Sequence, residues 1–238
     1  MSALAALLFA TPVFGLALEP PAFDAAFLAS PPAIEAYASL EPELIAQTAA
    51  AADAAAEAEE ERVYTEQVRQ RREIGQIHRA LGIATWVSMT ATAVLGFIQY
   101  YNLYGVGAGQ DENPCAQGNA VFGQDQCYGI PWPHRISSIT TSALYATTFA
   151  LTFVMPDPNH VNDARGAFAD RLRVHEVLRW VHLVGMVAQA VIGIGLTSGW
   201  FGDRANDYST LQTVAVVHQV VGWTTWGAMT AAGAIMLF

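Results

Sequence analysis

Two apolar segments of this chain repeat each other, and each begins with a histidine. HRALGIATWVSMTA begins at His78 and HQVVGWTTWGAMTA begins at His218, so the repeat is offset by 140 residues. The segments share His, Gly, Thr, Trp, Met, Thr and Ala at matching places. At about 100° per residue, the His, Gly, first Thr and Met lie on one stripe of a helix. A repeated stripe that carries a titratable side chain able to bind a metal predicts two equivalent histidine sites inside a membrane helix bundle.

The composition is typical of a polytopic membrane protein with an acidic N-terminal part. The chain has 238 residues, of which 53% are hydrophobic and 13% are charged, whereas soluble domains are about 25% charged. Residues 19–73 carry 12 of the 21 acidic side chains. The net charge of −10 argues against a nucleic-acid partner, because binding to phosphates requires clustered basic side chains.

Four long apolar segments follow the acidic part, and we expect each to span the membrane. They run over about residues 77–100, 134–155, 172–196 and 211–238. Each is long enough to cross a hydrocarbon core of roughly 30 Å at 1.5 Å per residue. The sequence therefore predicts an all-α membrane protein, an antiparallel four-helix transmembrane bundle over residues 75–238 in contact with lipid. An acidic, Ala/Glu-rich helical arm over residues 19–74 precedes it.

The orientation of this bundle has two competing interpretations. Residues 1–18 are apolar and end in small residues, as a secretory signal does, although the basic n-region of such a signal is missing. A cleaved signal would leave the acidic arm outside the cell. Nine arginines lie on the arm side of the bundle, and the positive-inside rule places that side in the cytoplasm. Both interpretations agree with a multi-pass protein of the inner membrane.

The two cysteines, Cys115 and Cys127, lie in one polar loop. Their shared loop favours a disulfide and an oxidising compartment over the alternative of two free thiols. The sequence contains no CxxCH, which excludes covalent attachment of a c-type heme.

Five of the six histidines lie at or near the starts of the four apolar segments. In an antiparallel bundle, the second and fourth segments start at one face, and the first and third start at the other. His134 is therefore expected to pair with His218. His78 therefore pairs with the third segment, which offers both His182 and His175, seven residues apart on one helix face. Greater depth favours His182 and leaves His175 as a surface or donor-side group. Two axial imidazoles on facing helices bind the iron of a b-type heme, so two hemes are expected.

Three further residues, two arginines and one histidine, have minor expected roles. Arg79 and Arg135 each follow a histidine directly, and a guanidinium is a suitable partner for a heme propionate. Snorkelling to lipid headgroups is the alternative for both. His160 lies in the polar loop DPNHVND and is expected to be solvated.

This pattern resembles the core of the cytochrome b561 family. The motifs that carry the resemblance are HRALG at His78, PHR at His134, RVHEVLRWVH ending at His182, and VHQVVGW around His218. The resemblance implies two noncovalent b hemes and electron transfer across the membrane, from a donor such as a quinol or a soluble redox partner to an acceptor. The chain would then be the electron-transfer component of an oxidoreductase. Family members usually carry further helices or a donor domain, whereas an acidic arm stands here.

Two other functions stay open. One is a heme-free membrane scaffold whose acidic arm docks a protein partner. The other is a quinone-binding anchor subunit for a peripheral oxidoreductase, with one heme or none. The predicted spanning segments contain almost no Asp or Glu, so proton translocation is not expected.

Overall fold

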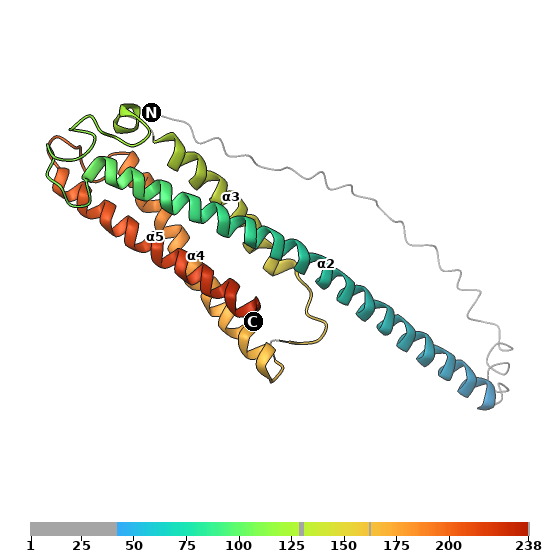
Figure 1. Cartoon of the computed structure of the whole chain (residues 1–238). Helices are drawn as coiled ribbons and strands as arrows, with labels where there is room; N and C mark the ends of the chain where they lie inside the picture. The colour runs from blue at the N-terminus through green and yellow to red at the C-terminus, as the bar shows by residue number, and fades with distance from the viewer. Residues whose placement is uncertain (1–41, 129–130, 162, 238) are drawn as a thin grey trace, which may run out of the picture. The chain divides into compact units, whose positions relative to one another are not determined.

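The structure is a computed structural model that describes residues 42–128, 131–161 and 163–237. Within these ranges every regular element is helical, as Figure 1 shows. The elements are α2 (Pro42–Tyr104), the short helix η2 (Gln124–Cys127), α3 (Trp132–Val154), α4 (Ala167–Thr197) and α5 (Tyr208–Leu237). The predicted all-α fold with four long helices is therefore confirmed. The signal-like segment 1–18 and residues 19–41 of the arm lie outside the described residues.

The chain forms two compact units, Met1–Ala58 and Glu59–Phe238. In the first unit, α2 begins at Pro42, and the side chains from Leu44 to Ala58 are exposed. Alanine and glutamate have high helix propensity, which accounts for an exposed helix in this segment. The helix is continuous past residue 74, where the arm was predicted to end.

In the second unit, the part of α2 from Tyr64 to Arg71 contacts the loop between α3 and α4. Arg71 donates hydrogen bonds to the carbonyl of Pro156 at 2.6 Å and to the carboxylate of Asp157 at 2.9 Å. The Tyr64 hydroxyl donates to the Asn159 side-chain oxygen at 2.7 Å. These contacts fix the α3–α4 loop to the basic part of α2.

Two of the four helices are long and apolar enough to cross a membrane. They are α2, within Leu44–Tyr104, and α4, over Ala167–Thr197. Four such helices were predicted, and among the described residues α3 and α5 do not reach the same mean hydropathy. The reason is their content of hydroxyl, amide and imidazole side chains, such as the run SSITTS in α3. Thr141 of this run lies at the contact with α2, whereas Thr140 and Ser142 are exposed.

The contact between α2 and α3 is a ladder of hydroxyl groups. Thr85 and Thr148 are 3.1 Å apart through their Oγ1 atoms. Thr141 of α3 lies 2.7 Å from the Ser88 hydroxyl and 2.8 Å from the Thr92 hydroxyl. Thr85 and Thr141 are both buried. The Ser/Thr-rich pattern thus positions α3 against the repeated stripe of α2 by hydrogen bonds instead of bulky apolar contacts.

Helices α4 and α5 run side by side (Figure 1) and pack closely through small residues. A Cβ atom at Gly185 of α4 would lie 2.0 Å from Oγ1 of Thr225, so glycine is required at this crossing. At one end of the bundle, Cys115 and Cys127 form the predicted disulfide, with Cα atoms 5.5 Å apart.

Candidate functional site

The structure brings four histidines together in two pairs, each pair joining two different helices. The ring centroids of His78 in α2 and His175 in α4 are 6.5 Å apart, with ring planes at 79°. Those of His134 in α3 and His218 in α5 are 6.4 Å apart, with ring planes at 86°. All four residues are half-buried. We call these pairs site 1 (His78 and His175) and site 2 (His134 and His218).

The spacing of each pair suits two imidazoles that share one metal ion. A metal–imidazole nitrogen bond is about 2 Å long, so two rings bound on opposite sides of one ion have centroids about 6 Å apart. Direct contact between two rings allows shorter separations. Both centroid separations therefore match that of two imidazoles on one ion.

Backbone carbonyls orient the rings of site 1. Nδ1–H of His78 donates to the carbonyl of Thr148 at 3.1 Å, and Nδ1–H of His175 donates to the carbonyl of Ala232 at 2.9 Å. A carbonyl only accepts, so each ring carries its proton on Nδ1. The bare nitrogen is then Nε2, the atom available to a metal.

In site 2, one of the two rings has the same hydrogen bond from Nδ1–H to a backbone carbonyl. Nδ1–H of His134 donates to the carbonyl of Thr92 at 3.2 Å. Nδ1 of His218 is buried and has no hydrogen-bond partner among the residues that the structure describes. Each ring lies against a glycine of a neighbouring helix. A Cβ at Gly96 would be 2.8 Å from Cε1 of His134, and a Cβ at Gly193 would be 3.3 Å from Cε1 of His218.

The two sites are related by the sequence repeat. The carbonyl that orients His134 belongs to Thr92, and the one that orients His175 belongs to Ala232. Thr92 and Ala232 are separated by the same 140 residues as His78 and His218. The repeat therefore equates α2 with α5 and α3 with α4, so that site 1 becomes site 2 when the two halves are exchanged.

The expected pairing of His78 with His182 needs a correction. The described ring contact of His78 is with His175. His182 is 8% exposed, and its Nδ1 lies 2.8 Å from the hydroxyl of Tyr145 in α3. The deeper ring is instead engaged by a phenol that the sequence analysis did not single out, and which of the two histidines binds a heme stays a prediction. Tyr145 is a buried aromatic residue within the Ser/Thr-rich helix, and no signal in the sequence pointed to it.

The structure also describes the surroundings of Arg79, Arg135 and His160. Arg79 and Arg135 are exposed, and no hydrogen bond or ion pair of either side chain is found within the described ranges. Their proposed role toward propionates stays a prediction. His160 is exposed in its loop, as expected.

The two sites lie at different depths along the bundle. His78 of site 1 and Thr92, the carbonyl partner in site 2, are 14 residues apart on α2, which is about 21 Å at 1.5 Å per residue. Trp86 lies between them on α2, and it stacks on Trp226 of α5 with ring centroids 6.4 Å apart. The sites are thus well separated and have an aromatic pair at an intermediate level.

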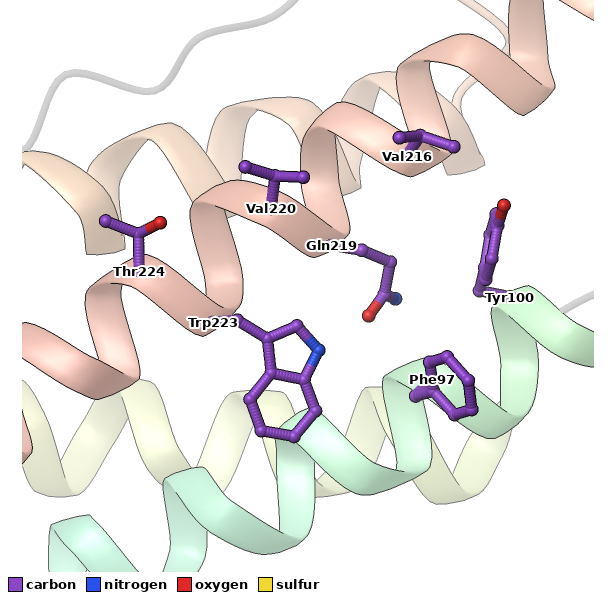
Figure 2. A pocket seen from close by; sticks show the side chains of 7 residues that line it. All are labelled: Phe97, Tyr100, Val216, Gln219, Val220, Trp223 and Thr224. Atoms are coloured by element: carbon purple, nitrogen blue, oxygen red, sulfur yellow. The ribbon is translucent and has the colours of Figure 1, made fainter. Parts of the chain in front are cut away.

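An apolar cleft opens between α2 and α5 at the level of site 2. Its lining residues are Phe97, Tyr100, Val216, Gln219, Val220, Trp223 and Thr224. Figure 2 shows Gln219 and Trp223 of α5 projecting toward α2, where Phe97 and Tyr100 lie. Gln219 directly follows His218 in the sequence. Its amide is the most polar group in a cleft whose other lining residues, Thr224 apart, are aromatic or aliphatic.

No family model, no curated protein and no solved structure matches this chain. The function is therefore argued from the geometry of the two sites.

Proposed function

We propose that this protein carries electrons across the inner membrane as a multi-pass b-type cytochrome with two noncovalent hemes, one at site 1 and one at site 2. The observation that carries the proposal is the pair of imidazole spacings, 6.5 Å and 6.4 Å, each between two different helices. Four helices contribute one ring each. A scaffold protein has no need of this arrangement at two symmetry-related places.

The number of protein ligands supports heme over a bare metal ion. Among the described residues, no group of three or more His, Cys, Asp or Glu side chains is placed to hold a metal. Structural zinc sites have four protein ligands and catalytic ones three. Two imidazoles alone suit an iron that already has four ligands from a porphyrin.

Each residue of the sites has a defined task in this proposal. A bound heme supplies an iron that takes up and releases one electron. The imidazoles would hold the iron through Nε2, and the carbonyls of Thr148, Ala232 and Thr92 fix the ring orientation. Such outer contacts keep a ligand in one tautomer and strengthen its basicity. Gly96 and Gly193 leave room for the rings of site 2.

The length and apolar character of α2 and α4 support a membrane location. Both helices contribute a histidine to site 1. Helices α3 and α5, which contribute site 2, pack against them through hydroxyl contacts and small residues. In this proposal all four helices cross the bilayer, with Thr141 and Thr148 of α3 and Thr225 of α5 buried between helices.

The second candidate is a quinone-binding anchor subunit, and the α2–α5 cleft is the observation that favours it. A quinone ring needs an apolar slot with few polar groups, and Gln219 supplies one beside site 2. The two candidates differ in the number of hemes per chain.

Spectroscopy of protein purified from heme-replete cells tests the proposal. A reduced-minus-oxidised spectrum with a b-type α band and about two hemes per chain supports the two-heme cytochrome. One heme per chain supports the anchor subunit. A colourless protein contradicts the two-heme cytochrome and leaves the scaffold or a heme-free anchor subunit.

A further inference from the structure

A partly buried arginine lies near site 1 without a counter-charge. Arg179 follows His175 by one turn of α4. Its guanidinium carbon is 5.4 Å from the ring centroid of Trp180, 5.6 Å from that of Phe153 and 5.9 Å from that of Phe149. Its Nε atom is buried and has no hydrogen-bond partner in the described part of the chain. The cation is thus held among aromatic faces.

The charge of Arg179 acts on the histidines around it. Arg179 lies four residues after His175 of site 1 and three residues before His182, so the three side chains share one side of α4. No acidic side chain of the described residues forms an ion pair with it, including Glu176, three residues earlier on α4. A charge in weakly polarisable surroundings interacts more strongly with its neighbours than one in water. Site 1 therefore lies beside a cation that has no ion-pair partner among the described residues.

Site 2 has no such cation at the equivalent place. His134 and His175 are equivalent because their Nδ1–H groups donate to repeat-related carbonyls. The position four residues after His134 is Ser138, where site 1 has Arg179. The Ser138 hydroxyl donates to the carbonyl of Arg135 at 2.8 Å. The two halves of the protein thus differ in charge at a matched position.

The basic side chains nearest to site 2 do not replace the missing cation. Arg135 is exposed. Arg204 is engaged in the disulfide loop, where it donates to the carbonyl of Cys127 at 2.9 Å. The position that matches His182 is Thr141, whose hydroxyl bonds to neutral hydroxyl groups of α2.

We propose that Arg179 holds the reduction potential of the site 1 heme above that of the site 2 heme, so that electrons pass from site 2 to site 1. Reduction adds one negative charge at the iron, and a nearby uncompensated cation stabilises the reduced form. One electron leaves the ferrous iron of site 2 and reduces the ferric iron of site 1, and no proton is required. The inference rests on the proposed function, because it presupposes a heme at each site.

Potentiometric titration of the purified two-heme protein, followed at the α band, tests this inference. His218→Ala and His175→Ala each leave one heme and assign the two midpoints. We expect the site 1 heme to have the higher midpoint. Arg179→Gln should shift the site 1 equilibrium by about tenfold toward the oxidised form, which is 59 mV for a one-electron couple. The site 2 midpoint should stay unchanged, and Arg179→Lys should retain most of the wild-type value.

The mirror variant Ser138→Arg provides an independent test should Arg179→Gln lose its heme. It places a guanidinium at the equivalent position and should raise the site 2 midpoint without moving that of site 1. A higher midpoint at site 2 than at site 1 in the wild-type protein overturns the inference. A site 1 midpoint that stays the same when the charge at residue 179 is removed also overturns the inference. A protein without an α band contradicts the proposed function itself, which separates the two failures.

Discussion

Trp86 of α2 and Trp226 of α5 stack on each other, and each indole donates a hydrogen bond to a threonine of the other helix. The indole N–H of Trp86 donates to Oγ1 of Thr230, and that of Trp226 donates to Oγ1 of Thr90, each at 2.9 Å. The ring planes are 28° apart. The Trp and Thr pairs are repeat-related, so the contact has an internal two-fold relationship. It fixes the register of α2 against α5, and with it the depth of both histidine sites.

The reciprocal hydrogen bonds predict matching coupling energies. In a double-mutant cycle of Trp86→Phe with Thr230→Ala, the coupling should be about 0.5–1 kcal/mol, the range for hydrogen bonds between membrane helices. Trp226→Phe with Thr90→Ala should give the same value, because the two contacts are equivalent. Equilibrium unfolding in mixed micelles, followed by circular dichroism, provides the free energies. Clearly unequal couplings would contradict the internal symmetry.

The assignment of site 1 predicts that His175, and not His182, is a heme ligand. His175→Ala should remove the same heme as His78→Ala and leave one heme per chain. His182→Gln should retain both hemes, because His182 is engaged with Tyr145. Heme quantification and the α-band spectrum of each variant provide the measurement. Loss of one heme in His182→Gln, with two hemes retained in His175→Ala, would restore the pairing expected from the sequence.

Gly96 is predicted to be essential for site 2. In Gly96→Ala the new Cβ would lie 2.8 Å from Cε1 of His134, so the ring must move and one heme should be lost or altered. Gly82→Ala, on the same helix, is the matched control, because its Cβ would lie 4.0 Å from the nearest atom, in Thr148. The heme content of Gly82→Ala should equal that of the wild type. Equal heme content and spectra in both variants would argue against a ligand role for His134.

The α4–α5 crossing is predicted to be sensitive to a single methyl group. Gly185→Ala would place Cβ 2.0 Å from Oγ1 of Thr225, and overpacking of this kind costs about 1–3 kcal/mol. Gly227→Ala is the control, since no atom lies within 4 Å of its added Cβ. It should be neutral or stabilising by up to about 1 kcal/mol, because alanine has the higher helix propensity. Thermal unfolding of the two variants compares these effects, and equal midpoints would contradict the close packing.

The disulfide predicts that thiol reagents do not label the native protein. Cys127 is buried, and both cysteines are bonded to each other. Labelling should therefore require a reductant, and the half-buried Cys115 should then react before Cys127. Replacing both cysteines with serine should destabilise the loop by about 3 kcal/mol, the typical value for a short disulfide-closed segment. Mass spectrometry of alkylated protein detects the label, and labelling of two thiols without reductant would exclude the bond.

The sequence by itself determined the number of long helices and the repeat, and it favoured the disulfide. Periodic apolar segments bounded by Pro and Gly fix helices locally, because backbone geometry depends on near neighbours. Two cysteines in one short loop leave a single internal pairing. The pairing of His134 with His218 also followed from the sequence, since α3 and α5 start at the same end of an antiparallel bundle.

Only the tertiary structure decided which histidine of α4 faces His78. His175 and His182 share one helix face, so periodicity does not separate them. The choice depends on the axial position of α4 relative to α2, which the contacts of α5 and the α3–α4 loop determine. It also depends on Tyr145, a residue of another helix that engages His182. The surroundings of Arg179 come from α3 as well as α4, and side-chain neighbours across helices are set by packing rather than by local sequence.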